Sequence, residues 1–200
     1  MAITINGTGS ITGLTAGGLP DGSVTAADLA AGAGGKILNV WQGVFTGIQS
    51  FAPGSSAPGP RADITNLSVT LTPTSASSRF LITCSISMGG ASNSPAYYLM
   101  RDSTDILLNT SSLGATTLAT WGSHQSGNPG YYYSSDLQTI SYVDSPATTS
   151  SITYKVQGQN AFGAGGAVYV NTSYQSGNVN DTSYYNVRGC STITVMEISS

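Results

Sequence analysis

Charge is the property that this 200-residue chain has least of. Six Lys/Arg and nine Asp/Glu residues make only 8% of it charged, whereas typical soluble domains are about 25% charged. The basic residues are scattered from Lys36 to Arg188 without a run, which argues against nucleic-acid binding through phosphate contacts. A surface with so few charges resists self-association poorly, so we expect an assembled state in which subunits pack together.

Long hydrophobic runs and targeting signals are missing as well. No apolar run reaches the roughly 18 residues that a membrane-spanning helix needs, so we expect no membrane insertion. The first residues, Met1 to Ile5, lack the basic region and apolar core of a secretory signal. We therefore expect synthesis in a cytoplasm.

Cysteine and histidine are too few to suggest a metal or cofactor site. Cys84 and Cys190 lie far apart in the sequence. A disulfide between them is one alternative, but in a reducing compartment we expect two buried free thiols. The single histidine, His124, has no Gly-x-Ser-x-Gly nucleophile motif to act with, and one histidine with two distant cysteines makes no convincing zinc site.

Carboxylates are also sparse, which argues against an enzyme. A glycosidase needs two carboxylates held a few ångströms apart. Asp102 and Asp105 are close in sequence, but Asp-Ser-Thr-Asp is more simply a hairpin turn, and it lacks the further oxygen ligands of a calcium loop.

What the chain does have is strand patterning. The hydrophobic fraction is 40%, Gly alone contributes 25 residues, and Ser with Thr makes up more than a quarter of the chain. From Arg79 to Met88 apolar side chains alternate with mostly polar ones, which predicts the central strand of an antiparallel sheet. The apolar positions of this strand are Phe80, Ile82, Cys84, Ile86 and Met88.

Other short strands separated by polar turns predict an all-β fold, an antiparallel jelly-roll-like sandwich. Ile37–Phe45 is apolar on both parities, which suits a strand covered on both sides. Leu67–Leu71 and Arg79–Met88 look like a hairpin, and Gln49–Pro60, with three prolines, looks like a surface loop. The remaining predicted strands are Ala96–Arg101, Ile106–Asn109, Gln138–Val143, Ile152–Val156, Val168–Val170 and Ser191–Ile198.

Residues 1–35 differ in texture from the β-domain predicted at 36–200. They hold two β-like fragments, Ile3–Gly7 and Ser10–Leu14, and a short helix is predicted at Ala26–Ala31 with Thr25 as its N-cap. The helix is under three turns and would not be stable alone. With too few large apolar side chains to fold by itself, this segment must order against sister copies or a docking partner.

Two aromatic loop regions are the candidate ligand-binding sites. Tyrosine set among Ser, Gly and Asn offers flat apolar area with a hydroxyl at small entropy cost, as in antibody paratopes, and sugar rings stack on such faces. The open alternative is that several tyrosines pack the sandwich edge or a subunit interface, which we favour for Tyr97 and Tyr98. The candidate ligand-binding residues are Trp121, His124, Tyr131, Tyr132 and Tyr133 near 121–135, and Tyr174, Tyr184 and Tyr185 near 172–188.

Three stretches together resemble the small tail-fibre and virion-appendage proteins of tailed bacteriophages. They are Gly18–Leu29, Leu137–Pro146 followed by Ile152–Val156, and the ending Ser191–Ile198. The resemblance leaves residues 40–135 uncovered and includes no chemically diagnostic motif. It implies a homotrimer with an N-terminal part attached to other virion proteins and a C-terminal β-domain that contacts a host glycan or surface protein.

On this chain, the resemblance implies a tail location after assembly in the host cytoplasm. It assigns virion attachment to residues 1–35, with Leu14, Leu19, Pro20, Val24 and Leu29 as the expected contacts. Two alternatives stay open. One is a structural capsid-decoration, head-fibre or baseplate protein. The other is a polysaccharide depolymerase, although phage depolymerases tend to use long parallel β-helices and this chain is short and unrepetitive.

Overall fold

The computed structural model describes residues 4–5, 11–12, 37–53, 58–89, 94–111, 117–123, 135–161, 166–173 and 188–199. The chain divides into two units, Met1–Lys36 and Ile37–Ser200. In the first unit, β1 (Thr4–Ile5) pairs antiparallel with β2 (Ile11–Thr12), so both predicted β-like fragments contain strand. The helix predicted at Ala26–Ala31 lies outside the described residues.

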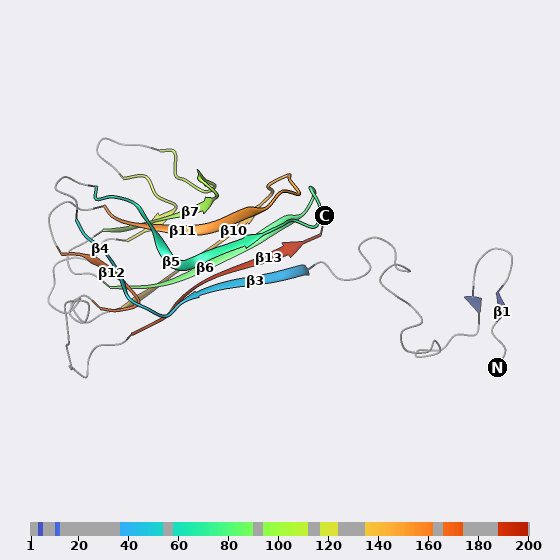
Figure 1. Cartoon of the computed structure of the whole chain (residues 1–200), viewed down its shortest axis with the longest axis horizontal. Helices are drawn as coiled ribbons and strands as arrows, with labels where there is room; N and C mark the ends of the chain where they lie inside the picture. The colour runs from blue at the N-terminus through green and yellow to red at the C-terminus, as the bar shows by residue number, and fades with distance from the viewer. Residues whose placement is uncertain are drawn as a thin grey trace. The chain divides into compact units, whose positions relative to one another are not determined.

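The second unit is all-β and consists of two antiparallel sheets with a shared core, which confirms the predicted sandwich (Figure 1). The jelly-roll strand order stays a prediction. The first sheet contains β3 (Ile37–Phe45), β4 (Gln49–Phe51), β6 (Arg79–Gly89), β10 (Asp136–Asp144), β12 (Val168–Val170) and β13 (Ser191–Ile198). The second sheet contains β5 (Ala62–Leu71), β7 (Pro95–Arg101), β8 (Thr104–Asp105), β9 (Trp121–Gly122) and β11 (Ile152–Asn160). Within the described ranges, no helix has the length and hydrophobicity needed to cross a membrane.

The predicted central strand is the centre of the first sheet. β6 pairs with β10 along one edge and with β13 along the other, and β12 joins it at Met88 and Gly89. β3 then pairs with β13, and β4 with β12. The apolar parity of β6 is fully buried, so the alternation in the sequence identified the core face correctly.

The core between the sheets is built from the inward parities of strands on both sides. Phe80 on β6 meets the ring of Tyr154 on β11 at a centroid distance of 5.8 Å. Leu67, Val69 and Leu71 of β5 belong to the same buried cluster. At one edge the backbones of β3 and β5 come very close, because a Cβ on Gly43 would lie 2.6 Å from the carbonyl oxygen of Asn66. Glycine at this position therefore allows the sandwich to close on that side.

The predicted hairpin between Leu67–Leu71 and Arg79–Met88 is wrong. β5 pairs with β11 in the second sheet, whereas β6 lies in the first. The link 72–78 thus crosses from one sheet to the other. The reason is that the apolar side chains of both strands pack in one core, and in a sandwich they face each other from opposite sheets.

Three further expectations from the sequence need correction. Gln49–Phe51 is not loop but strand β4, because it finds a distant partner in β12. Ile106–Asn109 is not a return strand, since the partners of β7 on that edge are the two-residue strands β8 and β9. β3 is covered on one side only, and Val40 and Val44 on its other side are exposed.

The predictions for the cysteines and the two adjacent tyrosines are only partly right. Both cysteines are free, but Cys84 is buried and Cys190 is exposed, because Cys190 has the outward parity just before β13. Tyr97 and Tyr98 are not at a subunit interface, since both are buried within the chain. Tyr97 lies in the main core, and Tyr98 lies in a second cluster on the other face of β7.

Candidate ligand pocket on the outer face of β7

Residues 106–111 and 117–123 pack over the outer face of β7 and along its edge. The amide of Ile106 donates to the carbonyl oxygen of Leu99 at 3.1 Å, and the amide of Thr120 donates to that of Tyr97 at 2.9 Å. Between these two anchors, the described part of the chain is residues 106–111 and 117–120. Its apolar side chains, Leu108 and Ala119, pack with Ala161 on the outward residues of β7, which are Ala96, Tyr98 and Met100.

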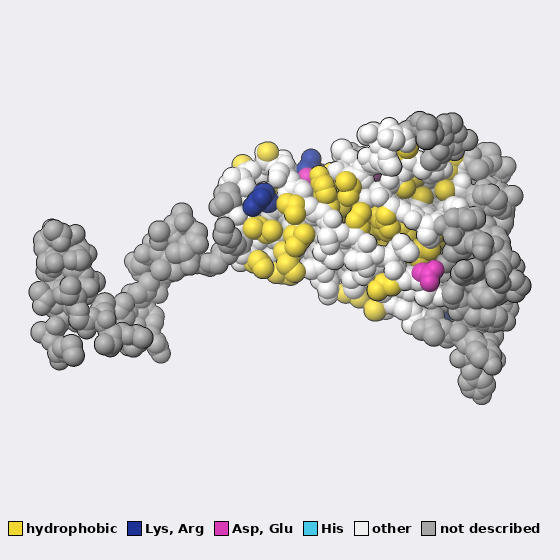
Figure 2. All heavy atoms as spheres, turned by 180° about the vertical axis from the view of Figure 1, so that it is seen from behind, with side chains coloured by type: hydrophobic (Ala, Val, Ile, Leu, Met, Phe, Trp, Pro, Cys, Tyr) yellow, Lys and Arg dark blue, Asp and Glu magenta, His cyan; other side chains and the backbone are white. Residues whose placement is uncertain are grey.

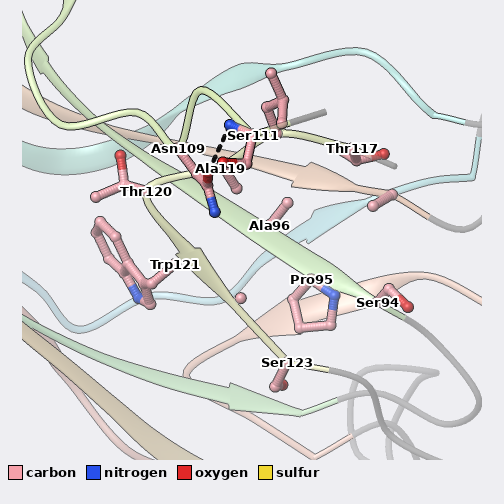
Figure 3. A pocket seen from close by; sticks show the side chains of 13 residues that line it. Ser94, Pro95, Ala96, Asn109, Ser111, Thr117, Ala119, Thr120, Trp121 and Ser123 are labelled. Atoms are coloured by element: carbon pink, nitrogen blue, oxygen red, sulfur yellow. Dashed lines mark hydrogen bonds between the residues drawn. The ribbon is translucent and has the colours of Figure 1, made fainter. Parts of the chain in front are cut away.

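A pocket of about 550 Å³ lies between this segment and the start of β7 (Figure 3). None of the side chains that line it is charged. Its polar lining residues are Ser94, Asn109, Ser111, Thr117, Thr120 and Ser123, and its other lining residues are Pro95, Ala96, Leu118, Ala119, Trp121, Gly122 and Ala161. Such a mixture of hydroxyls, one amide and small apolar groups suits a neutral ligand that carries both hydroxyls and C–H surface.

Hydrogen bonds within the lining fix its walls. The Asn109 side-chain oxygen accepts from the amide of Ser111 at 2.9 Å, which closes a local turn. The hydroxyl oxygen of Thr120 accepts from the amide of Leu99 at 2.9 Å and ties the returning segment to β7. The walls are therefore attached to a strand of the sandwich rather than formed by a free loop.

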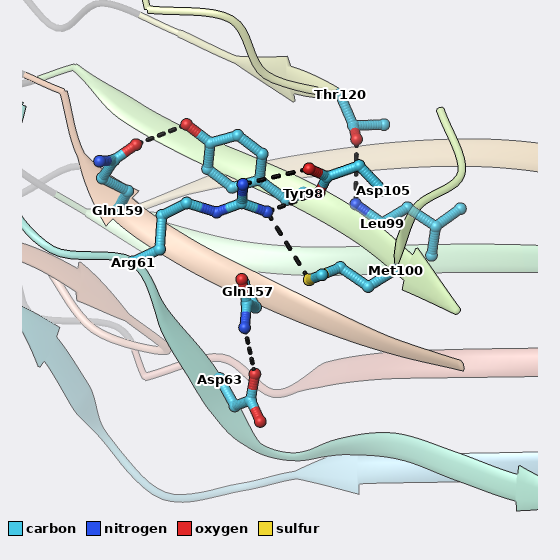
Figure 4. A network of polar contacts seen from close by, with 9 residues as sticks. All are labelled: Arg61, Asp63, Tyr98, Leu99, Met100, Asp105, Thr120, Gln157 and Gln159. Carbon is cyan, nitrogen blue, oxygen red and sulfur yellow. Dashed lines mark hydrogen bonds and ion pairs between the residues drawn. The ribbon is translucent and has the colours of Figure 1, made fainter. Parts of the chain in front are cut away.

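A polar network supports the outer face of β7 next to the pocket (Figure 4). The guanidinium of Arg61 stacks 3.5 Å from the ring centroid of Tyr98, and its Nη2 contacts Asp105 at 2.6 Å. The Tyr98 hydroxyl donates to the side-chain oxygen of Gln159 at 2.5 Å, and Gln159 in turn donates to the carbonyl oxygen of Gly59. Burial raises the pKa of Tyr98, which keeps the phenol neutral and able to donate.

Trp121 is the one predicted ligand-binding residue that the described ranges include. It lies on β9 opposite Tyr97, and their rings are 5.5 Å apart. Because opposite residues of an antiparallel pair project to the same face, its indole packs on the core while its strand forms one wall of the pocket. Its Nε1 is buried and has no hydrogen-bond partner among the described residues. A role in binding stays a prediction for this residue.

The other predicted site residues lie outside the described ranges. They are the ligand-binding candidates His124, Tyr131, Tyr132, Tyr133, Tyr174, Tyr184 and Tyr185, and the attachment candidates Leu14, Leu19, Pro20, Val24 and Leu29. Sequence reasoning in turn missed Asn109 and Thr117 as lining residues. Their residue types are those of any loop, so no local pattern in the sequence identified them as lining residues.

The carboxylates that were weighed for catalysis have structural partners. Asp102 is in the left-handed region, with φ 54°, at the turn between β7 and β8, and its Oδ1 accepts from the amide of Thr153 at 2.8 Å. Asp105 forms the ion pair with Arg61. The predicted hairpin turn is confirmed at Asp102 and Ser103, whereas Thr104–Asp105 is already strand β8. Among the described residues, no group of three or more His, Cys, Asp and Glu side chains lies close enough together to hold a metal ion.

No protein-family model matches the chain, and no curated protein sequence matches it either.

Proposed function

We propose that this chain is a non-enzymatic subunit of a tail fibre or similar appendage of a tailed bacteriophage, and that its β-domain binds a glycan of the host surface. The observation that carries the proposal is the uncharged pocket on the outer face of β7. The resemblance of Gly18–Leu29, Leu137–Pro146 and Ser191–Ile198 to phage appendage proteins supplies the biological setting.

The chemistry of the pocket favours a neutral sugar. A pyranose presents hydroxyls around its rim and C–H groups on its faces. The Asn109 amide and the Ser and Thr hydroxyls match the rim, and Pro95, Ala96 and Ala161 offer apolar contact. Because no lining side chain is charged, we expect neutral sugars to bind better than sialic or uronic acids, whose carboxylates would be desolvated without a partner.

The rest of the proposal follows the resemblance. Three copies assemble in the host cytoplasm, residues 1–35 dock to other virion proteins in the tail, and the jelly-roll-like body reaches outward. The aromatic loops near 121–135 and 172–188 supply further contacts to the host ligand.

The test is binding of the purified full chain to host polysaccharides by calorimetry, with a variant that fills the pocket. Thr117→Trp adds bulk to the lining and changes no core residue, so binding should fall at least tenfold. Ser103→Trp makes the same change at the exposed turn after β7 and should bind as wild type does. Equal binding by both variants, or no competition between the protein and virions for host cells, would contradict the proposal.

A structural role in the virion is the second candidate. It is favoured by the exposed apolar residues on the outer face of the first sheet, such as Val40 and Leu137, which a neighbouring capsid or baseplate protein would cover. This role predicts weak binding to host cells and strong binding to virions stripped of the protein. The two measurements on one preparation separate the candidates.

A further inference from the structure

The outer face of the first sheet has an ordered pattern of residues. Strands β3, β13, β6 and β10 lie side by side, and their registers place outward side chains in rows that run across all four strands. One row, named here the valine row, is entirely apolar and consists of Val40, Met196, Leu81 and Val143. The next two, named here the hydroxyl rows, are Gln42, Thr194, Thr83 and Ser141, and then Val44, Thr192, Ser85 and Thr139.

The two ends of the valine row are exposed in the single chain, and its middle members, Leu81 and Met196, are partly exposed. Val40 is 57% exposed and Val143 46%, and Leu137 farther along β10 is 64% exposed. The space-filling view shows bands of hydrophobic side chains separated by uncharged polar ones, with few charged groups (Figure 2). Apolar side chains gathered into bands of this kind mark an interaction site more often than scattered single residues do.

The hydroxyl rows are already hydrogen-bonded along the sheet. Gln42 Nε2 donates to the hydroxyl of Thr194 at 3.0 Å. The hydroxyls of Thr83 and Ser141 lie 3.1 Å apart, and those of Ser85 and Thr139 lie 2.9 Å apart. A partner that covered these rows would find side chains that already have hydrogen bonds within the sheet, so covering them costs less than burying unpaired hydroxyls.

The two sheets differ in what their outer faces offer. The second sheet is overlaid at β7 by Leu108 and Ala119, and its outward residues include the ion pair of Asp63 with Lys155. On the first sheet, the three rows defined above contain no charged residue, and Arg79 lies at one end, beyond the valine row. A face without charge can pack against a copy of itself without opposing like charges.

We propose that copies of this chain associate through this face, with the valine rows packed together around a common axis. The inference rests on the homotrimer within the proposed function and does not depend on glycan binding. Four strands about 4.8 Å apart and nine residues long, at about 3.3 Å per residue, give a footprint of roughly 570 Å². The accessible area of such a corrugated face is larger than its footprint, so it approaches the ~800 Å² per partner of a standard interface.

The point at which the chain enters the first sheet agrees with association between copies of the chain. β3 begins at Ile37, directly after residues 1–36, and Ile37 pairs with Ile198 in the row beyond the valine row. The segment that is predicted to order only against sister copies or a partner is therefore followed in the sequence by the strand that carries the exposed Val40 and Val44.

The test measures the mass and dissociation of the full chain by light scattering and analytical ultracentrifugation. Wild type should form an oligomer of the 20.4 kDa chain. The double variant Val40→Glu with Val143→Glu should dissociate at protein concentrations at least 100-fold higher than wild type does. Its far-ultraviolet circular dichroism spectrum should be unchanged. The matched control is Ser68→Glu, which adds a carboxylate to the exposed side of β5 and should dissociate as wild type does.

Two outcomes would overturn the inference: a monomeric wild type, or a double glutamate variant that dissociates at the wild-type concentration. If the glutamate variant does not fold, Val40→Ser with Val143→Ser replaces it, with an expected shift of at least tenfold, and no shift refutes the inference. Loss of glycan binding in an oligomeric wild type would count against the proposed function alone. A dissociated variant that still binds glycan would show that the β7 pocket and the association face of the first sheet act independently.

Discussion

Glu197 provides the sharpest test of how the two sheets are joined. Its side chain points inward from β13 and is 0% exposed. Its Oε1 accepts from the amide of Thr74 at 2.6 Å, and its Oε2 accepts from the Thr74 hydroxyl and from Asn39 Nδ2, each at 2.9 Å. One carboxylate thus holds together β3, β13 and the link that crosses from β5 to β6. We predict that Glu197→Gln destabilises the domain while preserving its fold.

The magnitude follows from the change in charge. Hydrogen bonds to a charged group contribute about 1.5–3 kcal/mol and neutral ones about 0.5–1.5 kcal/mol, so each of the three bonds loses roughly 1 kcal/mol. Because Thr74 and Asn39 are themselves exposed and water competes there, we expect a total loss of about 2 kcal/mol in the free energy of unfolding. For a domain of this size, that lowers Tm by roughly 4–8 °C.

The pH dependence distinguishes this mechanism from a simple packing defect. Burial raises the pKa of Glu197, but hydrogen bonds that include those from Asn39 and Thr74 outweigh this effect and hold the pKa below its ordinary value of 4.5. Its stabilisation is therefore complete above pH 4.5 and is lost as pH falls through the lowered pKa of the folded state. The difference between wild type and variant should be full at pH 7 and should shrink below about pH 4.5.

Urea unfolding at a series of pH values is the assay. Asp63→Asn is the matched control, since it makes the same carboxyl-to-amide change in an ion pair whose carboxylate is 54% exposed, and such pairs contribute about 0–1 kcal/mol. The reasoning is refuted if Glu197→Gln is as stable as wild type at pH 7, or if its deficit is the same at pH 3 as at pH 7.

Two further predictions concern the two free cysteines and the ion pair between Arg101 and Asp144. A thiol reagent should label one cysteine of the native protein, Cys190, because Cys84 is buried and burial raises its pKa to about 12; labelling of both without denaturant would contradict the packing of β6. Asp144→Asn should lower the free energy of unfolding, measured in urea, by about 2 kcal/mol. Asp144 accepts a hydrogen bond from Arg101 at 2.5 Å, and the arginine side chain is only 27% exposed. A loss below about 0.5 kcal/mol, the size of an ordinary surface substitution, would show that water replaces this contact.

Local alternation was enough to predict the longer strands but neither the shortest ones nor how the strands pair. Nine residues of period-2 pattern identified β6, its core parity and its central place, because a buried face requires that pattern wherever the strand lies. The partner of β5 could not be predicted in the same way, since a link of seven residues fits either a wide hairpin or a crossing between layers. β4 was missed because three residues carry almost no periodic signal, and its partner β12 is distant in the chain.

The residues of the candidate site could not be predicted from local sequence either. Composition singled out Trp121, but the direction of its indole is set by its pairing with Tyr97 across β9 and β7, and no local pattern encodes that register. Asn109 and Thr117 line the pocket because residues 106–111 and 117–120 are anchored to β7 at Ile106 and Thr120 and pack on its outer face. Their residue types are those of any loop, so only the tertiary structure distinguishes them as lining residues.

The prediction for β3 was wrong for the single chain, and the way it was wrong is informative. An apolar pattern on both parities is typical of a strand that is covered on both faces. In the structure, the parity of Trp41 and Phe45 packs on the core, while Val40 and Val44 on the other parity remain exposed. An edge strand that faced water in the functional state would be expected to carry charged side chains, which protect such strands from unwanted association. We therefore infer that the outward residues of β3 fit an environment that a lone chain does not supply, the same face of neighbouring copies.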